Sequence, residues 1–375
     1  MKRPNYQKNK KILALDGGGV RGALSVAFLE RIEWLYSEYS DTNQPLTLSS
    51  QFNLIGGTST GAIIATLLTL GYSTADIKAL YFKLATGIFQ RPWYRLKLFQ
   101  PVFDIQYLKT QIDQAIGSLQ LDSEALQTFL AIITKRMDTG SAWIVSNNSR
   151  SKYWNDPDDG SYIGNRHYRL ADLVRASTAA PYYFAPHEIG ICDGEPPGQF
   201  VDGGITPHNN PALALFQVAT IPAYGFGWSV GAETLRIISI GTGTYREYFS
   251  SEKIGKTPAL VLAIQALKSM VKDSSNEVMT LMQILGQTDT PWRINSEVGD
   301  LKDVLLPQKP LFTFQRYDVR LEQDWLKREL GMNLTEKHVK SLTQMENYKN
   351  IPLLYEIGQM AAEKQIKPEH LGLKA

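Results

Sequence analysis

Short apolar runs that end in glycine-rich turns alternate with helical patterns at the start of the chain. Residues 11–15 predict a short buried strand, which the turn at residues 16–19 ends. Apolar side chains then recur at helical spacing through residues 23–39, on a face formed by Leu24, Phe28, Ile32 and Leu35. This segment therefore predicts a strand, a glycine turn and a helix.

The same order follows at once in the next segment. Residues 52–55 predict a second strand, residues 56–61 a second turn of small residues, and residues 62–70 a second helix. Gly71 stands where a helix C-cap belongs, and residues 73–76 have the form of a capping box that opens a further helix. Because continuous apolar strands alternate with helices, we expect an α/β fold whose sheet is at least partly parallel.

The rest of the chain continues to mix strands and helices, without an internal repeat. Residues 86–104 interleave aromatic and basic side chains, which is typical of a lid or membrane-facing patch and equally of core residues under a solvated surface. Residues 151–164 are polar and predict a loop. Further strands are predicted at 126–134, 142–146, 200–201, 235–240 and near 311–319, and further helices at 170–179, 211–219 and 258–285.

Charge and cysteine content exclude some classes of function. The chain has 375 residues, of which 43% are hydrophobic, so it can bury a large core. Its 39 basic and 37 acidic residues give a net charge of +2, which offers no general field for binding nucleic acid. A single cysteine, Cys192, excludes an intrachain disulfide framework and a multi-cysteine metal site.

The hydropathy of the chain bears on its expected location and on its association with membranes. No apolar stretch reaches the roughly 18 to 20 residues that a transmembrane helix needs. The apolar run near the N-terminus is too short for the core of a signal peptide, and no cleavage pattern follows it. We therefore expect a cytoplasmic protein that touches membranes only peripherally.

The run Gly57-Thr58-Ser59-Thr60-Gly61 matches G-x-S-x-G and lies between a predicted strand and a predicted helix. This context is typical of a nucleophile elbow, in which a serine occupies a sharp turn. The flanking glycines lack Cβ atoms, so the backbone can fold back and expose the Ser59 hydroxyl at the helix N-terminus, where the helix dipole favours negative charge. Ser59 is the candidate nucleophile, and the alternative is a plain glycine-rich helix start.

The earlier turn, Asp16-Gly17-Gly18-Gly19-Val20-Arg21-Gly22, has two interpretations. It satisfies the dinucleotide-binding pattern G-x-G-x-x-G, but that pattern needs a following strand that ends in an acidic residue, and residues 52–55 lead into the serine turn instead. Its amides can also donate to the oxyanion of a tetrahedral intermediate, at about 3 to 4 kcal/mol per donor. Arg21 is either a bidentate ligand of a lipid phosphate or part of a structural salt bridge.

A serine nucleophile needs a base within hydrogen-bond reach. The best acidic candidate is Asp202, which follows a predicted strand and begins the turn Asp202-Gly203-Gly204. Of the five histidines, only His208 lies near this turn. The residues alone allow a Ser59 and Asp202 dyad or a triad that adds His208, and the chain order is compatible with both.

Three motifs in fixed order resemble those of the patatin-like phospholipases, of the bacterial type. They are D-G-G-G-x-R-G at residues 16–22, G-T-S-T-G at 57–61 and D-G-G at 202–204, supported by residues 175–181, 209–211 and 239–243. The resemblance implies a three-layer α/β/α fold related to the α/β hydrolases, with a catalytic core at residues 10–245. It also implies Ser59 as nucleophile, Asp202 as base, an oxyanion hole at residues 17–22, and a structural role for His208.

The expected function is therefore an acyl hydrolase that cleaves ester bonds of phospholipids or other polar lipids at a membrane surface, without metal or nucleotide cofactor. The alternatives are a histidine-triad esterase or thioesterase, and a glycine-loop protein that binds a nucleotide or phosphate without catalysis. Residues 246–375 are expected to be mostly helical, to include the strand near 311–319 and to pack on the core. This part leaves room for an activating ligand or partner and for a homo-oligomer.

Overall fold

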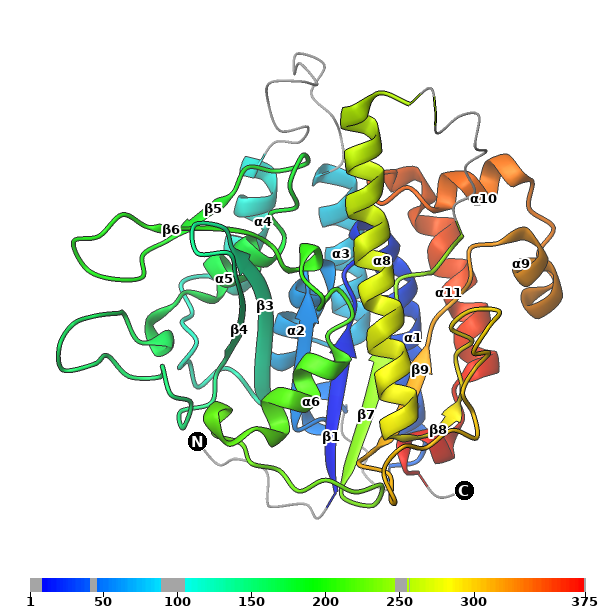
Figure 1. The fold of residues 1–375 in the computed structure, drawn as a ribbon, viewed down its shortest axis with the longest axis horizontal. Helices are drawn as coiled ribbons and strands as arrows, with labels where there is room; N and C mark the ends of the chain where they lie inside the picture. Colours follow the sequence, from blue (N-terminus) through cyan, green and yellow to red (C-terminus); the bar gives the residue numbers. More distant parts are fainter. Residues whose placement is uncertain (1–8, 41–45, 89–104, 247–254, 256, 374–375) are drawn as a thin grey trace.

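The computed structural model of the chain describes residues 9–40, 46–88, 105–246, 255 and 257–373. A nine-stranded sheet lies at its centre, with helices on both faces (Figure 1). The strands are β1 (Lys10–Leu15), β2 (Leu54–Thr58), β3 (Phe129–Arg136), β4 (Ser141–Ser146), β5 (His187–Ile189), β6 (Gly198–Asp202), β7 (Leu235–Ile240), β8 (Gln287–Thr290) and β9 (Thr313–Tyr317).

The sheet is mixed and mostly parallel. Its strands follow the order β5-β6-β3-β2-β1-β7-β9-β8, and β4 pairs with β3 beside this path. Neighbouring strands in the part β3-β2-β1-β7-β9-β8 of this order are parallel. The pairs of β3 with β4, β3 with β6 and β5 with β6 are antiparallel. The expected α/β fold with a partly parallel central sheet is confirmed.

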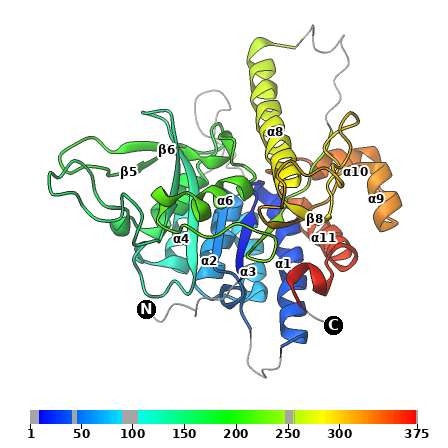
Figure 2. The same ribbon diagram turned by 60° about the horizontal axis from the view of Figure 1, so that its bottom comes forward.

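The helices form a layer on each face of the sheet (Figures 1 and 2). One layer contains α1 (Gly22–Glu38), α2 (Thr60–Thr69), α3 (Thr74–Ile88), α4 (Ile105–Ile116), α5 (Leu170–Ser177) and α11 (Ile351–Gln365). The other contains α6 (Ala212–Thr220) and the C-terminal half of α8 (Ala259–Leu285). Two further short helices, α9 (Gln323–Leu330) and α10 (Glu336–Leu342), precede α11 in the chain.

The buried side chains form two hydrophobic cores, one on each face of the sheet, because side chains alternate between the faces along each strand. In β1, Leu13 and Leu15 join the larger cluster with α1 and α2, whereas Ile12 and Ala14 join the cluster under α6 and α8. All four side chains are fully buried. Because successive side chains of a strand point to opposite faces, a strand that is apolar at every position marks a sheet covered on both sides.

The C-terminal part of the chain contributes to the same sheet. The predicted strand near residues 311–319 is present as β9, which pairs with β7, and β8 pairs with β9. In the helix layer on one face of this sheet, α11 packs tightly on α1, where a Cβ atom on Gly358 would lie only 2.8 Å from the Cβ of Ala27. The division into parts at residue 245 stays a prediction.

Several elements differ from the sequence prediction. β2 begins and ends later than residues 52–55, because Gly56 and Gly57 belong to the strand although they add no side-chain signal. The short strands β5 and β8 and the helix α4 were not expected. The aromatic and basic segment at 86–104 lies outside the described residues from 89 onward. Within the described residues, no helix combines the length and the apolar character needed to cross a membrane.

Candidate active site

Ser59 occupies the sharp turn between β2 and α2. Its backbone has φ 54° and ψ −121°, and only two other non-glycine residues among those described have positive φ. A backbone in this region costs about 1–3 kcal/mol, and such strain gathers at functional sites. The turn is tight because Gly57 and Gly61 are in contact: a Cβ atom on Gly57 would lie 2.2 Å from the Gly61 carbonyl carbon.

Strand pairing explains why Ser59 meets a residue 143 positions away. Strand β4 occupies one edge of β3, so β2 and β6 share the other edge. Thr58, at the end of β2, pairs with Ile133, and Asp202, at the end of β6, pairs with Thr134. Because β2 runs parallel and β6 antiparallel to β3, their carboxyl ends approach each other head-on.

The Ser59 hydroxyl donates a hydrogen bond of 2.5 Å to Oδ2 of Asp202. The other carboxylate oxygen accepts a 2.6 Å bond from the backbone N–H of Gly204, the third residue of the D-G-G turn. Asp202 is only 5% exposed, whereas Ser59 is partly exposed. Burial raises the pKa of Asp202 to about 6, while the bonds from Ser59 and Gly204 act in the opposite direction.

The segment after α5 holds both members of this pair. The Ser177 hydroxyl accepts a 2.8 Å hydrogen bond from the backbone N–H of Ser59 and donates one of 2.6 Å to the carbonyl of Ile133. Two residues later, the carbonyl of Ala179 accepts a bond from the N–H of Asp202. The segment after α5 therefore holds Ser59 and Asp202 at a fixed distance from each other. The sequence did not indicate that this segment has such a positioning role.

The loop at residues 16–22 lies against the serine. A Cβ atom on Gly17 would lie 3.3 Å from the Cβ of Ser59 and 2.6 Å from Oδ1 of Asn209, so a side chain at this position would crowd both residues. The carbonyl of Gly19 accepts hydrogen bonds from the hydroxyls of Thr60, at 3.1 Å, and Tyr81. Thr60 begins α2, so the loop and the serine turn are joined directly.

Not every amide of this loop is available to a substrate. The N–H of Gly17 donates to Asn209, that of Val20 to Met345, and those of Arg21 and Gly22 to carbonyls within the loop. Among the described residues, only the amides of Gly18 and Gly19 in this stretch donate to no acceptor. The oxyanion hole expected at residues 17–22 stays a prediction, and Gly18 and Gly19 are the residues there whose amides make no other hydrogen bond in the described part of the chain.

A buried ionic cluster anchors the start of this loop. The Arg316 guanidinium, in β9, donates to both oxygens of Asp16 at 3.0 and 2.6 Å, and to Asp318 at 2.6 Å and Ser239 at 2.7 Å. Arg316 and both carboxylates are at most 5% exposed. Burial raises the pKa of Asp16 to about 6, although Arg316 acts to lower it. The roles of Arg316 and Asp318 could not be recognised in the sequence, because neither residue belongs to a recognisable motif.

Arg21 is connected to the same ionic cluster through Gly243. It is 7% exposed, its Nη1 donates a 3.0 Å hydrogen bond to the carbonyl of Gly243, and its guanidinium lies over the ring of Tyr245. Gly243 in turn donates its N–H to Asp318. Within the described residues, Arg21 makes its side-chain hydrogen bond to a backbone carbonyl, and no salt bridge, one of its two possible roles, is formed there. A role in binding phosphate stays a prediction.

His208 lies near the site without joining it. Its carbonyl accepts a 2.6 Å hydrogen bond from the Thr58 hydroxyl, whereas its half-buried ring makes no hydrogen bond to Ser59 or Asp202 within the described part of the chain. Nδ1 of the ring is buried without a partner, and burial lowers the pKa of the imidazole. The described residues also contain no cluster of three or more His, Cys, Asp or Glu side chains that would hold a metal ion.

The family model for patatin-like phospholipases matches residues 13–216, more than half of the chain. The chain belongs to the patatin-like phospholipase family. This is a family of carboxylic ester hydrolases that act on lipids, so the patatin-like motifs noted in the sequence are confirmed as marks of the family. The matched region contains both Ser59 and Asp202, and it ends before β7, β8 and β9.

Named patatins are among the similar proteins. Patatin-2-Kuras 2 of Solanum tuberosum is 29% identical over 276 residues, which cover 68% of this chain and 67% of that protein. Patatin-like protein 4 of Arabidopsis thaliana is 27% identical over 339 residues, covering 81% and 80%. The solved structure of human GIVD cytosolic phospholipase A2 aligns with 97% of this chain and 60% of its own, at 9% identity and a TM-score of 0.47. That this patatin-like chain is of the bacterial type stays a prediction.

Proposed function

We propose that this chain is a phospholipase A-type acyl hydrolase that cleaves ester bonds of polar lipids with a Ser59 and Asp202 dyad. The observation that carries the proposal is the 2.5 Å hydrogen bond from the Ser59 hydroxyl to the buried Asp202 carboxylate. The histidine-triad alternative has no such support, because no hydrogen bond joins the His208 ring to either residue in the described part of the chain. Family membership supports the lipid substrate.

In the first half of the reaction, Ser59 Oγ attacks the ester carbonyl carbon while Asp202 Oδ2 takes the hydroxyl proton. A carboxylate is a weak base in water, but burial raises the pKa of Asp202 to about 6, which brings it closer to the pH of the reaction. Negative charge develops on the carbonyl oxygen, and the amides of Gly18 and Gly19 are the proposed donors to it. When the tetrahedral intermediate collapses, Asp202 returns the proton to the departing alcohol, which leaves the acyl group on Ser59.

In the second half, water replaces the alcohol. Asp202 takes a proton from this water as its oxygen attacks the acyl carbon. The same amides stabilise the second tetrahedral intermediate. Collapse breaks the bond to Ser59 Oγ, Asp202 gives its proton back to that oxygen, and a fatty acid is released. Each proton removed is returned, so the dyad needs no cofactor.

Reaction with a fluorophosphonate probe tests the nucleophile, because such probes label only activated serines. We expect the wild-type chain to be labelled, and both labelling and lipid hydrolysis to fall by about 10⁴-fold or more in Ser59→Ala. Ser229→Ala, a change at a serine remote from the glycine turns in sequence, is the matched control. A wild-type chain that takes no label and releases no fatty acid from mixed membrane lipids would favour the non-catalytic binding protein.

A further inference from the structure

The N-terminal half of α8 carries apolar side chains that nothing in the described structure covers. The C-terminal half packs on the sheet and α6 through Val278, Met279 and Met282, which are at most 4% exposed. In the N-terminal half, by contrast, large apolar side chains are exposed. There, exposure reaches 43% at Val261, 42% at Leu262, 61% at Leu267 and 63% at Met270.

These four side chains do not share one face. At 100° per residue, Leu267 and Met270 lie on one face of the helix, whereas Val261 and Leu262 lie on the side that also carries Gln265, Lys268, Ser269 and Lys272. A surface helix with an apolar face and a lysine-bearing polar face is suited to lie in the interface of a membrane.

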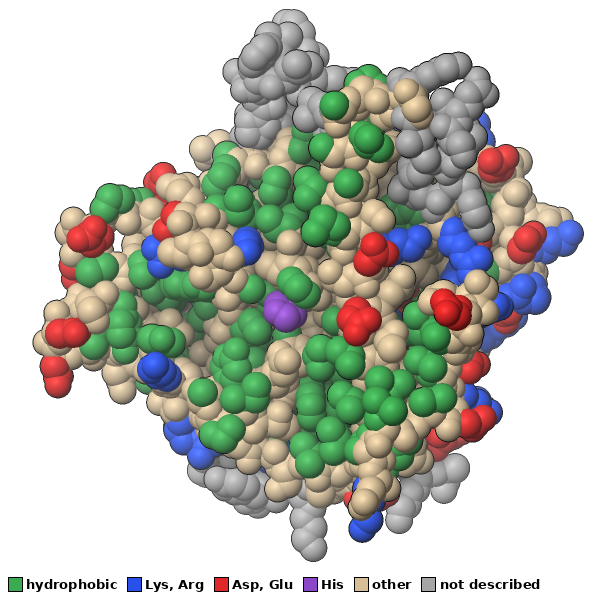
Figure 3. Space-filling model, in the orientation of Figure 1, with side chains coloured by type: hydrophobic (Ala, Val, Ile, Leu, Met, Phe, Trp, Pro, Cys, Tyr) green, Lys and Arg blue, Asp and Glu red, His purple; other side chains and the backbone are tan. Residues whose placement is uncertain are grey.

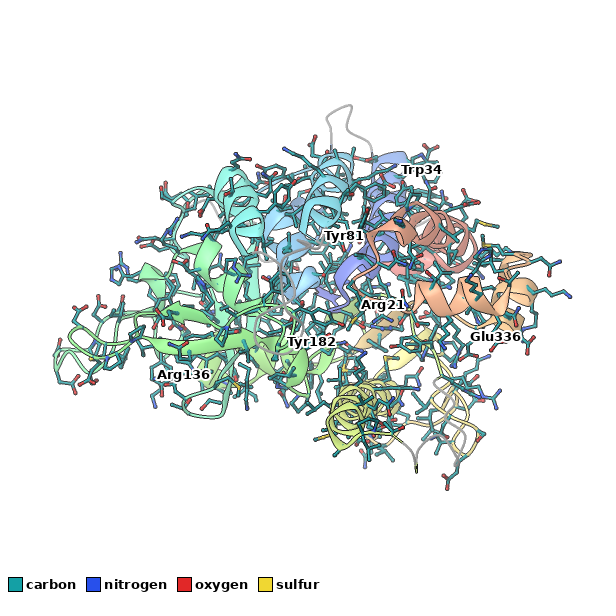
Figure 4. All side chains as sticks on the ribbon, turned by 90° about the horizontal axis from the view of Figure 1, so that it is seen from above. Arg21, Trp34, Tyr81, Arg136, Tyr182 and Glu336 are labelled. Carbon is teal, nitrogen blue, oxygen red and sulfur yellow. The ribbon has the colours of Figure 1, made fainter. Side chains whose placement is uncertain are left out.

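The projecting end lies on the same side of the molecule as the candidate active site. α8 extends past the carboxyl ends of the parallel strands, where Ser59 follows β2 (Figures 1 and 2). Hydrophobic side chains are visible at this end in the space-filling view (Figure 3). Seen from above in Figure 4, α8 points toward the viewer, and the half-exposed ring of Tyr182 lies between it and the strands.

The charges of this half-helix have one sign. Between residues 259 and 272 the only charged side chains are Lys268 and Lys272, and the first acidic residue is Asp273. Lysine stems can lie along apolar surroundings while their ammonium groups reach the polar boundary. An apolar helix end with two lysines is complementary to a bilayer that has anionic headgroups.

We propose that the N-terminal half of α8, residues 259–272, inserts into an anionic phospholipid surface and thereby holds the end of the molecule that carries Ser59 against that surface. This docking role adds to the proposed function, which supplies the reason why a lipid surface should face this end of the molecule. The insertion itself requires no catalysis, so the two proposals can fail separately.

Co-sedimentation with phosphatidylcholine vesicles that contain phosphatidylglycerol tests the insertion, with the full chain in the Ser59→Ala background so that no lipid is consumed. We expect Leu267→Glu/Met270→Glu to lower the partition coefficient at least tenfold. The matched control is Leu305→Glu/Leu306→Glu, which adds the same charge at side chains that are 41% and 69% exposed near the other end of α8. The control should bind as the parent does, and the melting temperatures of all three should agree.

A second prediction concerns the lysines. Lys268→Glu/Lys272→Glu should bind vesicles of phosphatidylcholine alone as the parent does, and should lose the gain in binding that phosphatidylglycerol provides. The proposal is overturned if the parent does not bind vesicles, or if the Leu267→Glu/Met270→Glu variant binds them unchanged. It is also overturned if light scattering shows that the parent is a dimer, that this variant is a monomer, and that neither binds lipid, because a second copy of the chain would then cover the helix.

Discussion

Replacing Asp202 by asparagine should inactivate the protein and stabilise it at the same time. The asparagine side chain has almost the shape of a neutral aspartic acid, and its oxygen can still accept the hydrogen bond from Gly204. What the change removes is a buried negative charge that has no cationic partner among the interactions of the described residues. The proposed base is therefore held in a form that folding disfavours, so that catalysis and stability oppose each other at this position.

The pKa of Asp202 sets the size of the effect. Folding raises it from 3.8 to about 6, so the stability that Asp202 contributes through proton binding is fully present below pH 3.8 and is lost as the pH rises through 6. Linkage then gives a cost of about 1.5 kcal/mol at pH 5 and about 3 kcal/mol at pH 8, as upper estimates. Asp202→Asn should recover this free energy, and its advantage over the wild type should widen with pH.

Urea unfolding at pH 5 and pH 8 measures this difference directly. We expect the unfolding free energy of Asp202→Asn to exceed that of the wild type at both values, and by about 1.5 kcal/mol more at pH 8 than at pH 5. Asp193→Asn, at an exposed carboxylate, serves as the control and should follow the wild type at both. A variant that is less stable than the wild type at pH 8 would refute the reasoning, since the charge would then be stabilised by its surroundings.

Three further predictions concern the same site. The kcat/KM for ester hydrolysis should rise with pH through about 6 and then level off, because Asp202 must be ionised to accept the proton; a profile flat from pH 5 to 8 would exclude this base. Arg316→Met should cost about 3–5 kcal/mol in urea unfolding, since Asp16 and Asp318 would stay buried without their counter-charge, and Arg316→Lys should recover part of it. His208→Ala should keep kcat within about threefold while Ser59→Ala loses it by the factor stated above; loss of activity with the fold intact would reinstate the triad.

The sequence predicted those elements whose local pattern and tertiary environment agree. The strand predicted at residues 11–15 is present as β1, whose residues 12–15 are apolar and buried on both faces, and β7 lies at the predicted residues 235–240. Of the capping box predicted after Gly71, the N-cap bond is present: the Ser73 hydroxyl accepts the N–H of Asp76 and donates to its carboxylate. β5 and β8 could not be predicted in this way, because they are short, half-exposed and held mainly by their neighbours in the sheet.

In the candidate site, too, the sequence predicted the features with a local pattern and not those that depend on the fold. Sequence motifs pointed to Ser59 and Asp202, because glycine turns at strand ends have a strong local signature. They did not indicate how the two residues meet, since this depends on β2 and β6 sharing one edge of β3. The sequence also cannot show which amides of residues 17–22 are already bonded to other acceptors, because this depends on the folded chain.

The position of the glycine loop depends on residues far outside the matched family region. Arg316 and Asp318 lie a hundred residues beyond its end at 216, yet they bind Asp16 and Gly243, and the carbonyl of Met345 accepts the N–H of Val20. Because side chains alternate along a strand, a slip of β9 by one residue would turn Arg316 to the opposite face and leave Asp16 buried without its partner. The register of β9 on β7 is therefore as much a condition for an ordered glycine loop as the glycines themselves.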